Sequence, residues 1–154
     1  MLRVHYIDDN DMINTDSMAL TIYFQGCNLK CEGCHNPSLQ PFTGGIEYTP
    51  IRLLYELDTD YDLSQYDTVC LLGGEPLLQH KSSLIDLIYY LYKIGKKVWL
   101  YTGFEYDKVP SFVKDWCYCV KAGAYDPVNY PPIEGAKLAS ANQAYYYKDG
   151  RIVK

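Results

Sequence analysis

Residues 19–36 read ALTIYFQGCNLKCEGCHN. The first six residues are apolar, aromatic or β-branched, which is typical of a strand buried on both faces, and the run stops at Gly26. Three cysteines follow at once, with the spacing Cys27-x3-Cys31-x2-Cys34. This stretch therefore predicts a buried strand that ends in a glycine turn and delivers three thiols to one loop.

The same arrangement recurs along the chain. Residues 68–72 form an apolar run that stops at Gly73-Gly74, and residues 98–101 stop at Thr102-Gly103. Residues 118–120 stop shortly before Gly123. The carboxyl ends of parallel strands meet at one edge of a sheet, so we expect the four glycine-ended loops to face a single site.

Helical patterns separate these strands. Thr49 and Pro50 predict a helix start, with Ile51, Leu54 and Leu57 on one face. The 3.6-residue period of Leu84, Leu87, Ile88 and Leu91 predicts a helix over residues 83–94 that ends at Gly95. A third helix over residues 106–116 is interrupted by Pro110, which leaves Ser111 as its alternative start.

Strands that alternate with helices predict an α/β fold with parallel strands. The chain has 154 residues, whereas a closed eight-stranded (βα) barrel takes about 250. We therefore expect one domain over residues 1–154 that forms a partial (βα) barrel. Residues 145–148 and 151–153 flank Asp149-Gly150, which predicts a C-terminal hairpin or edge extension.

Composition limits the partners. The net charge of −5 disfavours nucleic acid, because phosphate binding needs clustered lysine and arginine. No apolar stretch reaches the roughly 20 residues of a membrane span, and the N-terminus lacks the layout of a signal peptide. These features predict a cytoplasmic protein without a membrane partner, in which the six cysteines stay reduced.

Three clustered thiols indicate a metal site, for which zinc and an iron–sulfur cluster are the candidates. Structural zinc is almost always closed by four ligands, whereas three thiolates on a cubane leave one iron open. Neither His35, adjacent to Cys34, nor Cys70, in mid-strand, is well placed as a fourth ligand. Cys70, Cys117 and Cys119 lie in apolar or aromatic surroundings and are interpreted as core residues.

The loop Gly73-Gly74-Glu75-Pro76 carries the second motif. Two residues without side chains at a strand end allow an amino acid moiety to approach the main chain closely. Alternatively, the glycines form only a turn, and Glu75 and Pro76 open a helix. The motif gains weight from its position in line with the cysteine loop.

Together, Cys27-x3-Cys31-x2-Cys34 and Gly73-Gly74-Glu75-Pro76 resemble the motifs of the radical S-adenosylmethionine family. The run from Gly26 to Asn36, with glycine just before the third cysteine, resembles the activating proteins of anaerobic ribonucleoside-triphosphate reductase. The resemblance extends through residues 99–103 and Asn142-Gln143. It implies an enzyme that generates a 5'-deoxyadenosyl radical and installs a glycyl radical on that reductase.

The resemblance also implies the site. Cys27, Cys31 and Cys34 would hold three irons of a [4Fe-4S] cluster, and S-adenosylmethionine would bind the fourth. The residues implied beside S-adenosylmethionine are Gly33, Cys34 and His35 at the adenine, Gly73, Gly74 and Glu75 at the methionyl group, and Tyr101, Thr102 and Gly103 at the nucleoside. The implied partners are the large reductase and a low-potential electron donor such as flavodoxin.

One departure and three alternatives stay open. Many such activases carry an Asp-Gly pair where this chain has Lys121-Ala122-Gly123. Lys121 is interpreted either as a polar group near the ligand or as a surface lysine whose stem covers apolar surface. The alternative functions are activation of another glycyl radical enzyme, radical chemistry on a small molecule as in deazapurine synthesis, and a zinc-stabilised binding module.

Overall fold

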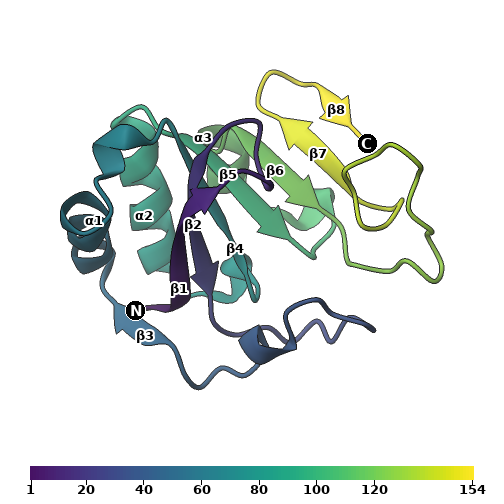
Figure 1. Cartoon of the computed structure of the whole chain (residues 1–154), viewed down its shortest axis with the longest axis horizontal. Coiled ribbons are helices and arrows are strands. Elements are labelled where there is room, and N and C mark those ends of the chain that lie inside the picture. The colour runs from purple at the N-terminus through teal and green to yellow at the C-terminus, as the bar shows by residue number, and fades with distance from the viewer.

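The computed structural model describes all 154 residues, and its strands form one eight-stranded sheet in the order β3-β1-β2-β4-β5-β6-β7-β8 (Figure 1). The strands are β1 (Leu2–Asp11), β2 (Ala19–Phe24), β3 (Ile46–Tyr48), β4 (Thr68–Gly73), β5 (Lys97–Thr102), β6 (Cys119–Ala122), β7 (Ala144–Tyr147) and β8 (Ile152–Val153). The sheet does not close, because β3 and β8 each have a single neighbour.

The four glycine-ended strands form the parallel centre of this sheet. β2 pairs with β4, β4 with β5, and β5 with β6, all in parallel register. β7 and β8 extend the sheet as an antiparallel hairpin. The predicted α/β fold with parallel strands and a C-terminal hairpin is confirmed. β1 and β3, which add to the other side of the sheet in antiparallel pairing, were not predicted from the sequence.

Three α-helices connect the strands: α1 (Pro50–Thr59), α2 (Lys81–Lys93) and α3 (Ser111–Trp116). Short 3-10 helices are η1 (Pro37–Leu39), η2 (Leu63–Gln65), η3 (Pro76–Leu78) and η4 (Tyr106–Lys108). The Thr49 side chain caps α1 by accepting a hydrogen bond from the amide of Arg52 at 3.3 Å. Pro110 separates η4 from α3, so the alternative start at Ser111 is the observed one.

The helices lie together on one side of the sheet (Figure 1). The larger core joins that side of the strands to α1, α2 and α3 through residues such as Leu57, Leu71, Leu87 and Leu100. Ile51 was predicted on the buried face of α1, but it is 79% exposed, because Leu53 and Leu57 take the core positions instead. None of the helices is long and apolar enough to cross a membrane.

The other face of the sheet carries a smaller, aromatic core. Trp99 contacts Tyr118, Tyr145 and Tyr147 at ring-centroid distances of 5.6 to 6.2 Å. Cys70 and Cys119 belong to this core, and Cys117 belongs to the larger one. All three are buried, as expected of core residues. Successive side chains of each central strand thus point to opposite faces of the sheet and pack in different cores.

Candidate functional site

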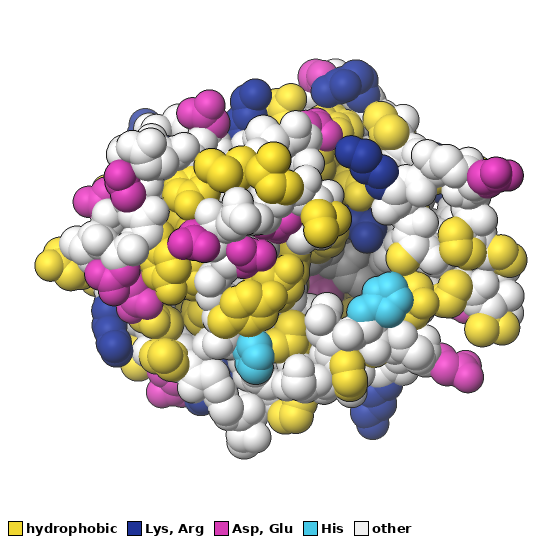
Figure 2. Space-filling view, in the orientation of Figure 1, with side chains coloured by type: hydrophobic (Ala, Val, Ile, Leu, Met, Phe, Trp, Pro, Cys, Tyr) yellow, Lys and Arg dark blue, Asp and Glu magenta, His cyan; other side chains and the backbone are white.

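A cavity of about 320 Å³ lies where β2, β4, β5 and β6 end, and Figure 2 shows that this face of the molecule is hollowed. All four glycine-ended loops contribute to its wall. The sequence-predicted residues that line it are Cys27, Cys31, Cys34, His35, Gly73, Gly74, Glu75, Tyr101, Thr102 and Gly103. Gly33 is the one candidate that does not line the cavity.

The cysteine loop has a backbone that few sequences adopt. Gly26 has φ 109° and Gly33 has φ 72°, values that favour glycine, and Lys30 takes φ 51° although it has a side chain. The loop is fixed at its start, because the amides of Gly26 and Cys27 donate to the carbonyls of Leu39 and Gln40 at 2.7 and 2.9 Å. Its thiols are all unpaired and half-buried.

The end of β4 is bound directly to this loop. The amide of Gly74 donates to the carbonyl of Phe24 at 2.8 Å, and the amide of Glu75 donates to the carbonyl of Gly26 at 2.9 Å. A β-carbon added to Gly74 would lie 2.4 Å from the oxygen of Gly26. Gly74 therefore has a packing role, since any side chain there would separate the two motif loops.

Glu75 joins a third loop to the same assembly. It is 1% exposed, and its carboxylate accepts hydrogen bonds from the Thr102 hydroxyl and the Gly103 amide, both at 2.8 Å. It also caps η3 by accepting from the Leu77 amide at 3.1 Å. Burial raises the pKa of Glu75, and the three donors oppose that change. The carboxylate thus holds the cavity wall together, and its oxygens already accept hydrogen bonds from the protein instead of being available to a ligand.

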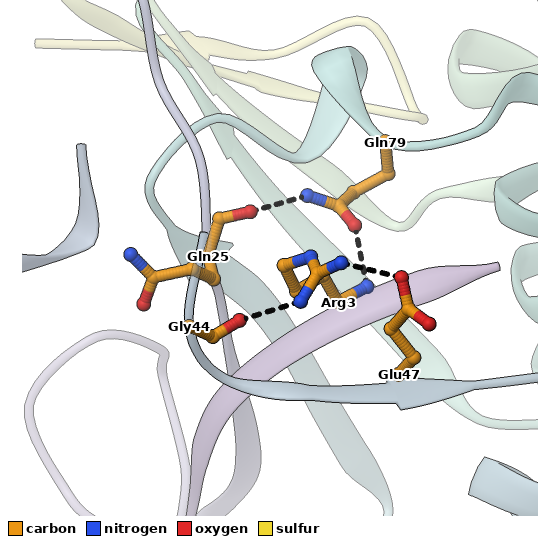
Figure 3. Close-up of polar contacts among 5 residues, drawn as sticks. All are labelled: Arg3, Gln25, Gly44, Glu47 and Gln79. Carbon is orange, nitrogen blue, oxygen red and sulfur yellow. Dashed lines mark hydrogen bonds and ion pairs between the residues drawn. The ribbon is translucent and has the colours of Figure 1, made fainter. Parts of the chain in front are cut away.

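A polar cluster behind the cavity supports both motif loops (Figure 3). The Gln79 side chain donates to the carbonyl of Gln25 at 3.0 Å and accepts from the Arg3 amide at 2.8 Å. The Arg3 guanidinium donates to the Gly44 carbonyl at 2.8 Å and pairs with Glu47. Gln25 and Gln79 stand just before Cys27 and just after η3, so the cluster ties the bases of the two loops together.

Lys121 is the one lysine or arginine among the residues that line the cavity. Its ammonium lies 4.7 Å from the centre of the Tyr101 ring, and it takes part in no ion pair. Burial lowers the pKa of this lysine, while the nearby Cys70 opposes the change. The interpretation as a polar group at the site is the one that agrees with this position.

His35 and Tyr125 close one side of the cavity. The Nε2 atom of His35 lies 3.2 Å from the hydroxyl of Tyr125, and their ring centroids are 4.6 Å apart. The contact joins the cysteine loop to the segment after β6. Gly33 lies on the outside of this contact, where an added β-carbon would be 3.8 Å from the Tyr125 ring.

The sequence assigned no role to Tyr125 and left the role of Lys121 open. Tyr125 is separated from His35 by 90 residues, and only the strand order brings the two together. The one available signal was position, since Tyr125 follows the end of the fourth glycine-ended strand and His35 follows the end of the first.

The donor set suits an iron–sulfur cluster. Three thiols from one loop line the same cavity, and no group of three or more His, Cys, Asp or Glu side chains converges closely enough to hold a single metal ion. A cubane does not need such convergence, because each thiolate binds a different iron. Burial raises the pKa of Cys27, with further increases from Glu75, Cys31 and Cys34, so cluster binding must release a proton there.

Comparison with known proteins agrees with this donor set. The family model described as "4Fe-4S single cluster domain" matches residues 13–123. The pyruvate formate-lyase-activating enzyme of Clostridium pasteurianum is 33% identical over 108 residues, which cover 68% of this chain and 43% of that protein. This chain therefore spans less than half of the length of that relative.

Shorter relatives are covered more fully. The anaerobic ribonucleoside-triphosphate reductase-activating protein of Escherichia coli K12 is 28% identical over 119 residues, which cover 70% of this chain and 73% of that protein. The protein of the same name from Enterobacteria phage T4 is 28% identical over 102 residues, at 64% and 65% coverage. Among solved structures, QueE from Escherichia coli matches 66% of this chain and 52% of its own, with a TM-score of 0.47 and 19% identity.

Proposed function

This chain belongs to the 4Fe-4S single cluster domain family of radical S-adenosylmethionine enzymes, and from that premise we propose that it activates a glycyl radical enzyme. The observation that carries the proposal is the opening of three unpaired thiols onto a cavity that Gly73-Gly74 also line. In this assignment Cys27, Cys31 and Cys34 hold three irons of the cluster. The fourth iron is left for S-adenosylmethionine.

The other residues of the wall bind and orient S-adenosylmethionine. Gly73 and Gly74 give the methionyl group access to the main chain, because no side chain covers the backbone there. Lys121 supplies a positive charge for the carboxylate of that group, since it lines the cavity, is half-buried and takes part in no ion pair. His35 and Tyr125 border the adenine side, and Tyr101 to Gly103 border the nucleoside.

The chemistry itself comes from the bound groups. When the cluster is bound and reduced, it supplies the electron that cleaves S-adenosylmethionine to methionine and a 5'-deoxyadenosyl radical, which takes a hydrogen atom from the target. The contribution of the protein is position and shelter from water. Glu75 contributes by holding Thr102 and Gly103 against the end of β4.

We assign the anaerobic ribonucleoside-triphosphate reductase as the target. Support comes from the activating proteins of Escherichia coli and phage T4, which match this chain over most of their own length. A low-potential electron donor such as flavodoxin would reduce the cluster. The six free cysteines suit a reducing compartment, so we place this activity in the cytoplasm.

The test is anaerobic reconstitution with iron and sulfide, followed by reduction with S-adenosylmethionine and the large reductase present. We expect 5'-deoxyadenosine together with a glycyl radical on the reductase in the electron paramagnetic resonance spectrum. A radical formed on pyruvate formate-lyase and not on the reductase would reassign the target. Absence of 5'-deoxyadenosine would contradict the proposed function as a whole.

A further inference from the structure

A second concave surface lies between α1 and α2, on the helix-covered side of the sheet. This groove has a volume of about 630 Å³ and shares no residue with the catalytic cavity. Its apolar lining includes Ile51, Leu54 and Tyr55 from α1 and Tyr90 from α2, with Ile94 directly after α2. We call it the α1–α2 groove.

Large apolar side chains remain exposed along this groove. Ile51 is 79% exposed, Tyr55 is 70% exposed, and Tyr90 and Ile94 are 49% and 44% exposed. A contiguous apolar patch with a polar border is typical of a surface that another molecule covers. The exposure of Ile51 in particular has no explanation in the core, because Leu53 and Leu57 occupy the buried positions of α1.

The border of the groove is negatively charged. Asp58 and Asp86 line it, and neither takes part in an ion pair. The chain between Arg52 and Lys81 contains no lysine or arginine. Besides Asp58 it carries five acidic residues, of which Glu56 lies in α1 and Asp60, Asp62 and Asp67 follow that helix.

The pKa of Tyr61, which follows α1, agrees with a negative electrostatic potential at this end of the helix. Burial raises the pKa of Tyr61, and the charges of Glu56, Asp60 and Asp9 raise it further. The ammonium of Lys96 donates to the carbonyls of Leu63 and Tyr66 at 2.9 and 2.7 Å. That ammonium is thus bound to carbonyl oxygens and forms no ion pair with Asp58 or Asp86.

We propose that the α1–α2 groove binds an amphipathic helix of another protein, whose apolar ridge is flanked by lysine or arginine. Grooves of this kind take apolar side chains spaced three or four residues apart on a helix, and the flanking charges steer the helix and fix its orientation. A second copy of this chain fits less well, since a two-fold contact would place Asp58 and Asp86 against the same carboxylates.

Occupation of the groove leaves the catalytic cavity open, because the two surfaces share no residues. A partner could therefore be held by its helix while another of its segments enters the cavity, which raises the effective concentration of that segment. The docking site is independent of the proposed chemistry, and its test needs neither the cluster nor S-adenosylmethionine.

The experiment measures fluorescence anisotropy of two labelled model peptides against the full chain. Both peptides are about 14 residues long, roughly four helical turns, with leucine at helical spacing. One carries lysine beside the leucines and the other carries glutamate. We expect the lysine peptide to bind about tenfold more tightly, and its affinity to fall as salt is added.

Substitutions locate the binding. Ile51→Glu should lower the affinity of the chain for the lysine peptide about tenfold. The double change Asp58→Lys with Asp86→Lys should make the glutamate peptide bind more tightly than the lysine peptide. Ile152→Glu and Asp115→Lys are matched controls on exposed residues of β8 and α3, and they should change neither affinity.

Equal binding of both peptides, or equal effects in the controls, would overturn the proposal. So would a concentration-dependent dimer that Ile51→Glu abolishes in sedimentation, because a second copy would then cover the groove.

Discussion

Lys121 is the residue whose position adds most to the motifs. Lys121 is half-buried and takes part in no ion pair, so its presence in the cavity wall indicates an anionic ligand. We predict that Lys121→Met raises the dissociation constant for S-adenosylmethionine about tenfold in the reconstituted protein. Equilibrium dialysis measures this effect.

The same variant separates binding from folding. The pKa of Lys121 is lowered in the folded protein, so its positive charge opposes folding at neutral pH. Lys121→Met should therefore unfold at a temperature no lower than the parent protein without cofactors. An unchanged dissociation constant, or an unfolding temperature that falls, would show that Lys121 serves packing and not the ligand.

Gly74 gives a second prediction at the scale of one residue. In Gly74→Ala the new methyl group would meet the backbone oxygens of Gly26 and Leu39 at 2.4 and 2.9 Å, and backbone atoms cannot move aside cheaply. We expect a loss of about 1–3 kcal/mol in the free energy of unfolding and weaker retention of iron. Gly103→Ala is the matched control, because its methyl group meets the flexible end of Leu29 at 2.4 Å and otherwise lies at an ordinary 3.7 Å from the Glu75 carboxylate.

Sequence patterns identified individual residues well where spacing along the chain carried the information. The three cysteines and Gly73-Gly74 lie within short motifs, and the structure brings them to one cavity. Tyr125 could not be found in this way, because its contact with His35 depends on the order of strands in the sheet. Glu75 was assigned to the ligand, whereas its carboxylate is occupied by Thr102, Gly103 and Leu77.

At the scale of elements, the turn between β1 and β2 depends on Asp11. Its buried carboxylate accepts from the Thr21 hydroxyl at 2.6 Å, the Asn14 side chain at 2.7 Å and the Ile13 amide at 2.9 Å. Burial raises the pKa of Asp11, but these donors outweigh burial and leave it below its ordinary value of 3.8. The turn also places Asn14, which accepts a hydrogen bond from Tyr101 in the cavity wall.

The sign of the resulting pH dependence follows from linkage. A lowered pKa in the folded state adds stability above the unfolded value, and this stability is lost as the pH falls through the folded pKa. We predict that Asp11→Asn lowers the free energy of unfolding by about 1–3 kcal/mol at neutral pH. The difference from the parent protein should shrink as the pH falls below 3.8, as urea denaturation at neutral and at acid pH would measure. A constant difference would contradict this account.

Strands and helices could be predicted where their buried residues follow a regular pattern in the sequence. β2, β4, β5 and β6 are apolar over most of their length, because both faces of the sheet are covered, and all four were identified. β1 was missed, because its sequence LRVHYIDDND alternates only briefly and ends in acidic residues. In α1 either Ile51 or Leu53 can lie on the buried face, and the apolar pattern of the sequence alone does not decide which of the two is buried.

At the scale of the whole molecule, the parallel centre of the sheet creates the site. Four strands end at the same edge, so loops separated by up to 90 residues meet around one cavity. The sequence predicted this convergence through its repeated strand-and-glycine pattern, and the chain length predicted that the barrel stays open. The sequence did not predict that β3 forms one edge of the sheet, because β1 and β3 were not recognised.

The central claim is that the loop thiols, and not the core thiols, support cleavage of S-adenosylmethionine. The most direct measurement is 5'-deoxyadenosine formation by the reconstituted, reduced protein and by two variants, Cys31→Ala and Cys117→Ala. Cys31 lines the cavity, whereas Cys117 is 2% exposed in the core. We predict that Cys31→Ala abolishes product while its fold is retained, and that Cys117→Ala keeps most of the activity. Equal loss in both variants, or activity retained in Cys31→Ala, would contradict the account.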